Sequence, residues 1–270
     1  MSTQPRDDTD GSGSAAVHLF IVGDEILSGK RQDRHLPKVI GLLAARGLEL
    51  ARVELLPDDE AAIARSIARV AAEGGVLLSC GGIGATPDDC TRQAAARAFG
   101  VPIEPHTEGV ALIEAEYAGR AHPNRVLMAH FPRGAGLVPN PVNRVSGFSM
   151  GRCYFVPGFP EMAWPMLEWV LDNPLQHLHR SQAPVEYSLR AFGTRGEGDL
   201  LELMESTLRE FPQVKLSSLP AIGDATRPRH IEFGIKGPGA AAAAAFAWFR
   251  QRLERYEGVR IEDLKVPSPG

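Results

Sequence analysis

GVLLSCGGIGATPDDCTRQAAARAFG, residues 75–100, is the stretch of this sequence that decides its fold. It begins with a short apolar run, residues 75–80, which predicts a strand buried on both faces of a parallel sheet. A glycine-rich turn follows, and residues 88–100 then have the apolar spacing and the terminal glycine of a helix. The turn therefore lies at the carboxyl end of a strand, which is where open α/β folds bind their ligands.

Strands and helices alternate on the amino-terminal side of this stretch as well. Residues 17–23 form an apolar run rich in β-branched side chains, and residues 48–56 predict a second strand. Residues 34–46 and 57–74 predict the helices between these strands, from apolar spacing and from an acidic first turn. This βαβαβ order predicts a mostly parallel sheet with helices on both faces, joined by right-handed crossovers. The fold class is therefore α/β.

The carboxyl-terminal side divides into two parts. Residues 122–151 are rich in proline, glycine and asparagine and predict no long regular element, although residues 152–158 predict a strand after them. The polar, proline-ended segment 178–184 indicates a boundary, beyond which the pattern predicts a small α+β domain of order βαββα. We expect helices at 109–120 and 161–175, a disordered tail at 1–16, domains at 17–178 and 184–262, and a second tail at 263–270.

The composition excludes several classes of protein. With 44% hydrophobic and 23% charged residues in 270 positions, the chain is typical of globular proteins, and its formal net charge of -4 argues against generic nucleic-acid binding. Three cysteines without a CxxC pair argue against a disulfide framework and a zinc ribbon. No run of about 18 apolar residues occurs, and the polar, acidic amino terminus is unlike a signal peptide. We therefore expect a cytoplasmic protein that binds neither nucleic acid nor membrane.

The glycines of the central turn predict an anion site. Gly81, Gly82 and Gly84 have no Cβ, so the backbone can turn tightly and direct N–H groups at an anion near the start of the following helix. Thr86 could add a hydroxyl donor, although threonine near a helix start is as often a cap, and the same holds for Thr91. A small molecule with a phosphate group, such as a phosphorylated pterin, fits this turn.

Two aspartates close the same turn. Asp88 and Asp89 would repel an anion unless a divalent cation bridges them to the phosphate, and hard oxygen ligands suit Mg²⁺. Alternatively, an aspartate caps the helix that begins near Cys90, and we expect one aspartate in each role. No histidine spacing typical of a metal site is present, and Cys90 has no evident partner base for nucleophilic chemistry. Cys80 is expected to pack within the sheet.

Two further loops are expected at the same edge of the sheet. The loop GDEILSGKRQDRH at 23–35 follows the first strand and carries both carboxylates and cations. The stretch VPGFPEM at 156–162 is stiffened by prolines and places a glutamate near a helix start. The alternative interpretations are a solvated charged loop and a rigid turn. Outside the first loop, the candidate ligand residues are Asn140, Gly158, Pro160 and Glu161.

The order of these motifs resembles the molybdopterin-binding (MoaB/Mog-type) domain family. GDEILSG, GGIGATPDDCT, FPRGAGLVPNPV and VPGFPEM occur in the family's order across residues 17–175. The subgroup they resemble most contains the amino-terminal domain of competence/damage-inducible protein CinA and a similar domain of eukaryotic FAD synthases. The resemblance implies a three-layer α/β/α domain, a loop that binds the phosphate end of a pterin (molybdopterin itself is one candidate) or a nucleotide, and homo-oligomers. By position it assigns ligand contacts to Gly81, Gly82, Gly84, Thr86, Asp88 and Asp89 in one loop and to Gly23, Glu25, Ser28, Gly29 and Asp33 in the other.

Three functions are compatible with these features. The first is a module that binds a phosphorylated pterin or nucleotide. The second, which the resemblance implies, is metal-dependent hydrolysis of a dinucleotide pyrophosphate such as ADP-ribose or FAD, with Asp88 and Asp89 as catalytic residues and as ligands of Mg²⁺, Mn²⁺ or Co²⁺. The third is a noncatalytic oligomeric scaffold with a decayed site, suggested by His35, which stands where the family's pattern has an asparagine, and by the lack of the partner domains that we expect in full-length CinA and FAD synthase. A second departure from the pattern is Ala85, where proline is usual.

Overall fold

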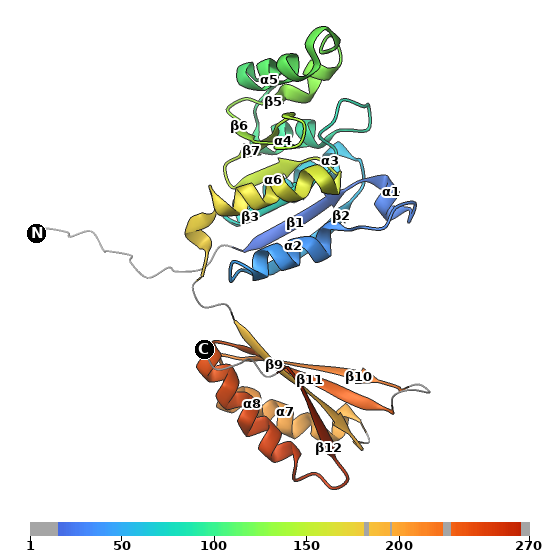
Figure 1. Cartoon of the computed structure of the whole chain (residues 1–270), viewed down its shortest axis with the longest axis vertical. Coiled ribbons are helices and arrows are strands. Elements are labelled where there is room, and N and C mark those ends of the chain that lie inside the picture. Colours follow the sequence, from blue (N-terminus) through green and yellow to red (C-terminus); the bar gives the residue numbers. More distant parts are fainter. Residues whose placement is uncertain (1–15, 181–183, 195, 224–227, 266–270) are drawn as a thin grey trace, which may run out of the picture. The chain divides into compact units, whose positions relative to one another are not determined.

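A computed structural model describes residues 16–180, 184–194, 196–223 and 228–265 of the chain. The chain divides into two compact units, residues 1–179 and 180–270 (Figure 1). No helix among the described residues is long and apolar enough to cross a membrane. The tail expected at 1–16 lies outside the described residues except for its last residue.

Six strands form the main sheet of the N-terminal unit, in the order β2-β1-β3-β8-β7-β6. The first four are parallel, whereas β7 pairs antiparallel with β8 and with β6. The prediction of a mostly parallel α/β sheet is confirmed, and the proline-rich region contributes only short strands. The strands are β1 (Val17–Val22), β2 (Leu50–Leu56), β3 (Val76–Cys80), β6 (Gly136–Val138), β7 (Gly147–Met150) and β8 (Cys153–Val156), and β4 (Ile103–Pro105) and β5 (His130–Pro132) form a separate pair.

Helices cover both faces of this sheet (Figure 1). Because successive strand residues point to opposite faces, Phe20 and Leu77 pack in one core with α3 and α4, while Leu19 and Leu78 pack in another with α2 and α6. Two cores on the two sides of one sheet make the three-layer arrangement. The helices are α1 (Asp24–Leu27), α2 (His35–Ala44), α3 (Glu60–Ala72), α4 (Thr91–Phe99), α5 (Thr107–Tyr117) and α6 (Pro160–Asp172), with 3-10 turns at Ala118–Arg120, Arg125–Ala129 and Gln176–Leu178.

Local chemistry sets the helix boundaries that matter for the site. The Asp59 side chain accepts a hydrogen bond from the Ala62 N–H at 2.6 Å and so caps α3. Helix α4 ends at Gly100, whose φ of 68° is the left-handed conformation that glycine adopts at helix ends. Helix α6 begins at Pro160, where the missing N–H of proline costs no helical hydrogen bond.

The C-terminal unit is a four-stranded antiparallel sheet, in the order β10-β11-β9-β12, with α7 and α8 packed against it. The predicted βαββα order is correct for β9 to α8, but it omits β12. The expected tail at 263–270 was therefore wrong for residues 263–265, which belong to β12. This strand reads RIEDLK, in which charges outnumber apolar residues, so periodicity gives little sign of it. The elements are β9 (Val185–Phe192), a 3-10 turn (Glu197–Leu200), α7 (Leu201–Glu210), β10 (Lys215–Ala221), β11 (His230–Gly237), α8 (Gly239–Leu253) and β12 (Arg260–Lys265).

Candidate functional site

Strands β1, β3 and β8 end side by side and pass into the three loops singled out in the sequence. The Gly81 N–H donates to the Val156 carbonyl at 3.0 Å. A Cβ on Gly81 would lie 2.3 Å from the Val22 carbonyl oxygen, and one on Gly158 would lie 3.3 Å from the Gly81 Cα. Gly81 also has a φ of 106°, a conformation that side chains rarely allow. Only glycines can therefore bring these loops so close together.

The loop after β3 is closed by the Asp89 side chain, which does not cap α4. The Asp89 carboxylate accepts hydrogen bonds from the Thr86 N–H, at 2.9 Å, and from the Thr86 hydroxyl. The predicted cap of α4 by an aspartate is wrong, because its N-cap residue is Cys90 and no side chain caps that helix. Asp88 is fully exposed on the loop, and hydrogen bonding with Thr86 lowers its pKa.

Thr91 is buried and holds the other end of the same loop. Its N–H donates to the Gly82 carbonyl at 2.9 Å and its hydroxyl donates to the Gly81 carbonyl at 3.0 Å. A Cβ on Gly82 would lie 2.3 Å from the Thr91 Oγ1. The Thr91 hydroxyl therefore serves the loop, which answers the question that the sequence left between a ligand contact and a structural role.

Four consecutive backbone donors of this loop remain free. The N–H groups of Gly82, Ile83, Gly84 and Ala85 find no acceptor among the described residues. These residues line a cavity of about 380 Å³. Successive free N–H groups in a turn form a concave site for an anion. The remaining walls of this cavity are Thr86, Asp89, Tyr117, Met128, Asn140, Asn143, Val145, Ser146, Pro157, Gly158, Phe159 and Met162.

A smaller cavity of about 140 Å³ adjoins the loop and is rich in carboxylates. It is lined by Glu25, Asp58, Asp88 and Asp89, with Arg31 as the cation. Burial raises the pKa of Asp58, and the neighbouring carboxylates raise it further. Asp58 could not be singled out from the sequence, because an aspartate just before a helix is common.

The carboxylates do not fit a metal centre in this structure. No group of three or more histidine, cysteine, aspartate or glutamate side chains within the described residues is arranged to hold a metal ion. One oxygen of Asp89 already accepts two hydrogen bonds from Thr86. The divalent metal therefore stays a prediction.

A third cavity, of about 510 Å³, lies between the loop at 23–35 and the start of α6. His35, in the place of the family's asparagine, is buried here, and its Nε2 lies 3.1 Å from the Gly158 carbonyl oxygen. Asp33, which precedes the N-cap residue Arg34, accepts the backbone N–H groups of His35 and Leu36 at 2.9 and 3.0 Å, so it satisfies two donors of the first turn of α2. Glu161 and Pro160 line the cavity from the first turn of α6.

Phe159 is a site residue that the sequence analysis did not single out. It lines all three cavities, and its side chain is 55% exposed. A ring in this position can stack on the planar ring of a ligand. The motif VPGFPEM contained this residue, but only the folded chain shows that its side chain is left uncovered.

Arg92 was also missed, although it lies only three residues after Asp89. Its guanidinium is buried and donates to the carbonyls of Gly84, at 2.6 Å, of His130, at 3.3 Å, and of Leu127. It therefore ties the loop to the segment that carries Met128. Burial lowers the pKa of Arg92. Its signal in the sequence was a charged residue among the alanines of α4.

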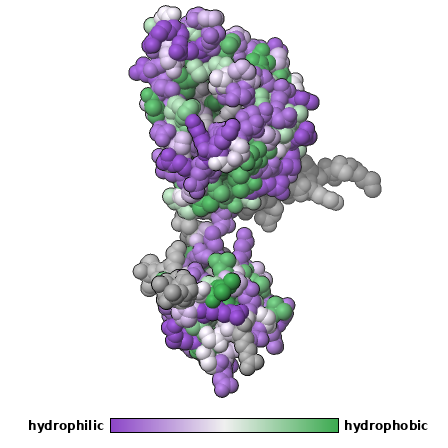
Figure 2. Space-filling view, turned by 90° about the vertical axis from the view of Figure 1, so that its right-hand side faces the viewer, coloured by the Kyte–Doolittle hydropathy of each residue, from purple (hydrophilic) through white to green (hydrophobic). Residues whose placement is uncertain are grey.

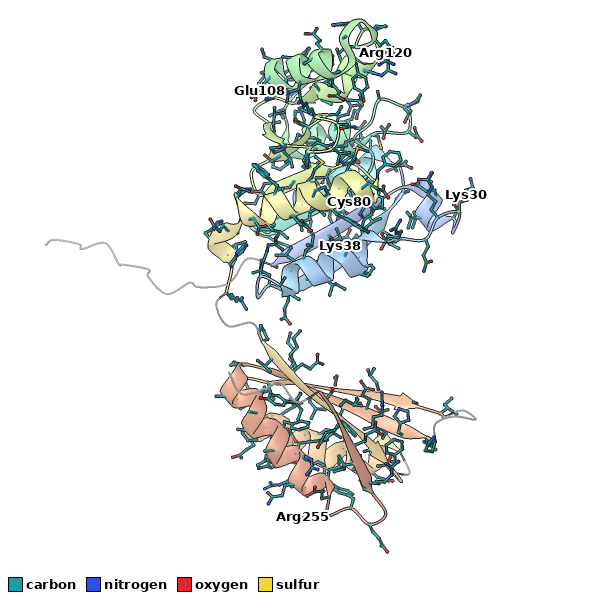
Figure 3. The ribbon with its side chains drawn as sticks, in the orientation of Figure 1. Lys30, Lys38, Cys80, Glu108, Arg120 and Arg255 are labelled. Atoms are coloured by element: carbon teal, nitrogen blue, oxygen red, sulfur yellow. The ribbon has the colours of Figure 1, made fainter. Side chains whose placement is uncertain are left out.

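The other predicted residues have varied surroundings. The Asn140 side chain donates to the Val145 carbonyl at 3.1 Å and accepts the Val142 N–H at 3.0 Å, so it shapes the turn that lines the cavity of about 380 Å³. Ser28 and Gly29 line none of the three cavities. They precede Lys30, which projects outward at the tip of its loop (Figure 3).

The cysteines are free and unsuited to nucleophilic chemistry. Cys80 is buried within the sheet, as expected, and burial raises its pKa (Figure 3). Burial also raises the pKa of Cys90 to about 11, with a contribution from nearby carboxylates. The thiol of Cys90 is therefore protonated near neutral pH.

Comparisons with known proteins agree with this arrangement. Residues 18–177 match the family described as "Probable molybdopterin binding domain". A CinA-like protein of Geobacter sp. (strain M21) is 33% identical over 211 residues, which cover 74% of this chain and 50% of that protein. A protein of Pyrobaculum calidifontis is 28% identical over 251 residues, 88% of this chain and 94% of the relative.

Among solved structures, a CinA protein of unknown function from Thermoplasma acidophilum has a TM-score of 0.54 and 23% identity, and covers 61% of this chain and 99% of its own. This likeness shows the fold of the N-terminal unit. The chain spans about half the length of the CinA-like relatives that it matches, for example 50% of the proteins of Geobacter sp. (strain M21) and of Citrifermentans bemidjiense.

Proposed function

Because this chain belongs to the CinA-like molybdopterin-binding domain family, we propose that the cavity of about 380 Å³ beside the loop after β3 binds a phosphorylated pterin or nucleotide. The observation that carries the proposal is the row of four N–H groups, Gly82 to Ala85, without an acceptor among the described residues, in a loop that lines a cavity with both apolar and polar walls. The N–H groups provide donors for a phosphate, and the cavity provides room for a ring.

The other residues of the site suit either the ring or the phosphate group of such a ligand. Met128, Val145 and Met162 are apolar walls suited to a planar ring, and the uncovered Phe159 side chain can stack on it. Arg31, in the adjoining cavity, offsets the repulsion between the phosphate and Asp88. Arg92 contributes indirectly, because it fixes the Gly84 carbonyl and so orients the loop.

A binding titration tests this proposal. Calorimetry of the whole chain with molybdopterin, AMP, FAD and ADP-ribose should show at least one ligand with a dissociation constant below about 1 mM, equivalent to roughly 4 kcal/mol. Phe159→Ala should weaken that ligand, while Leu201→Ala, an exposed apolar residue of the other unit, should not. If no ligand of the panel binds, the site is not a phosphate site, and the noncatalytic scaffold becomes the better account.

Hydrolysis of a dinucleotide pyrophosphate is a second candidate, favoured by the acidic cavity. This cavity shares Gly82, Gly158 and Phe159 with the larger one, so a water in it would lie beside the bound phosphates. Asp58, whose pKa is raised by burial, is the carboxylate of this cavity best suited to accept a proton from that water. The described carboxylates do not form a metal centre, so no step is assigned to a metal.

Turnover separates the two candidates. We expect a hydrolase to release mononucleotides from ADP-ribose or FAD, and we expect Asp58→Asn to lower kcat more than it raises KM. The test is run with and without Mg²⁺, Mn²⁺ or Co²⁺. If a ligand binds but no product forms under any of these conditions, hydrolysis is ruled out and only the binding function stands.

A further inference from the structure

The segment at residues 140–146 contributes polar side chains to the cavity of about 380 Å³, opposite in character to its methionines and Phe159. In Figure 2, which faces the sheet edge where β1 passes into α1 (Figure 1), hydrophobic residues are interspersed with hydrophilic ones on the N-terminal unit. A cavity with mixed walls selects a ring by its shape and by the hydrogen-bonding groups on its edge. The donors and acceptors that this segment offers therefore matter for the choice of ligand.

The Asn140 side-chain amide has a fixed orientation, because it is hydrogen-bonded to two backbone groups. Its Oδ1 accepts from the Val142 N–H at 3.0 Å, and its Nδ2 donates to the Val145 carbonyl at 3.1 Å. A backbone N–H can only donate and a carbonyl can only accept, so an exchange of Oδ1 and Nδ2 would lose both hydrogen bonds. Asn140 therefore directs a donor, and not an acceptor, at Asn143.

The orientation of Asn140 fixes that of Asn143. The Asn143 Oδ1 accepts from the Asn140 Nδ2 at 2.8 Å and from the Val145 N–H at 3.1 Å, which uses both of its lone pairs. The Asn143 Nδ2 has two hydrogens, and its partner among the described residues is the Met162 sulfur at 3.3 Å, a weak acceptor. Asn143 also lines the cavity. It therefore offers a ligand an N–H donor and no acceptor.

Ser146 adds a hydroxyl to the same wall. The residue is 7% exposed and lines the cavity, and its hydroxyl has no hydrogen-bond partner within the described part of the chain. A buried hydroxyl without a partner costs free energy, which a ligand group can recover. Because a hydroxyl both donates and accepts, Ser146 can pair with a ring nitrogen whether or not that nitrogen carries a proton. The choice between rings therefore rests with Asn143.

We propose that Asn143 makes this cavity selective for a heterocycle with a lactam edge, in which a ring carbonyl lies next to a ring N–H. The carbonyl accepts from the Asn143 Nδ2, and the ring N–H donates to the Ser146 Oγ. Adenine has an amino group in place of the carbonyl, so two donors would face each other at Asn143. Oxopurines and pterins share the lactam edge. This inference rests on the proposed function, because the loop after β3 holds the phosphate of the ligand.

Two nucleotides that differ only at this edge test the selectivity. IMP has the lactam edge and AMP has the amino group, on the same ribose and phosphate. Calorimetry of the whole chain should show that IMP binds about tenfold or more tightly than AMP. Molybdopterin, titrated in parallel, shows whether a pterin or a purine is the better source of the lactam. Equal affinities for IMP and AMP would overturn this inference alone, whereas no binding of IMP, AMP or molybdopterin would overturn the proposed function with it.

Asn143→Asp tests the residue itself. Aspartate keeps an oxygen for the Asn140 and Val145 donors but replaces the amide N–H groups by a second acceptor. The lactam ligand that binds best should lose about tenfold or more in affinity, and the preference for IMP over AMP should disappear or reverse. A preference that survived Asn143→Asp would show that Asn143 does not set the selectivity.

Two further variants control for charge and for the loss of one hydrogen bond. Asn124→Asp adds the same charge at an exposed asparagine that lines none of the three cavities, so it should keep the preference for IMP. Ser146→Ala should weaken IMP and AMP alike, because its hydroxyl can pair with either ring nitrogen. Circular dichroism shows whether each variant is folded. Loss of the preference in Asn124→Asp as well would assign the effect to charge and overturn the inference.

Discussion

At the scale of single residues, the loop at 81–84 has no room for a methyl group. A Cβ on Gly84 would lie 2.4 Å from the Asp89 Oδ2, so Gly84→Ala must push this carboxylate away from Thr86 and open the turn. We expect ligand affinity to fall about tenfold or more, which is about 1.4 kcal/mol. Calorimetry measures the loss. Gly119→Ala is the control, because nothing lies within 4 Å of its added Cβ, and equal affinities for both variants would contradict the prediction.

Arg92 is expected to stabilise the fold around the site. Arg92→Met leaves the carbonyls of Gly84, Leu127 and His130 without their donors in a buried environment. We expect the free energy of unfolding to fall by about 3 kcal/mol, as measured by denaturant titration. Arg97→Met on the same helix removes only an exposed ion pair with Glu60 and should change stability by less than about 1 kcal/mol.

The Cys90 thiol should react more slowly than an ordinary thiol of similar exposure. Because its pKa is raised to about 11, the reactive thiolate is scarce at neutral pH and increases as the pH rises toward that value. We expect the rate of alkylation by iodoacetamide, followed by mass spectrometry, to rise about tenfold for each pH unit from 7 upward. A rate that levels off near pH 8 would show an ordinary thiol instead.

At the scale of elements, Asp33 illustrates how a predicted ligand residue can be a structural one. Both of its carboxylate oxygens accept backbone N–H groups at the start of α2. We expect Asp33→Ala to lower the free energy of unfolding by about 1 kcal/mol and to leave ligand affinity little changed. Asp59→Ala, which removes the cap of α3, is the matched variant and should cost about as much. A loss of affinity without a loss of stability would instead make Asp33 a ligand contact.

The elements that sequence could predict are those whose apolar pattern is regular. Strand β3 and helix α4 follow directly from their periodicity, and the glycines between them identify the loop. Strand β12 was missed because its pattern is dominated by charge. Asp58 and Phe159 were missed for another reason. Their chemistry is ordinary in sequence, and only the joining of separate loops at one sheet edge gives them a shared cavity. Periodicity therefore predicts where the site lies, and tertiary packing decides which side chains enter it.

At the scale of the whole molecule, the two units have separate hydrophobic cores. The site described above belongs to the N-terminal unit alone. Phe249 of the C-terminal unit is fully buried, and its ring centroid lies 5.0 Å from that of Phe233. Ile67 on α3 is likewise fully buried in the core of the N-terminal unit.

Core substitutions should therefore act on one unit at a time. We expect Phe249→Ala to destabilise the C-terminal unit by about 3–5 kcal/mol, and Ile67→Ala to destabilise the N-terminal unit by about 2–5 kcal/mol. Scanning calorimetry of the whole chain should show two transitions, of which each variant lowers only one. Ligand affinity should survive Phe249→Ala at a temperature below both transitions, because no residue of the C-terminal unit lines the three cavities. If either variant lowered both transition temperatures together, the two units would unfold as one cooperative body. Their separate cores would then not make them thermodynamically independent.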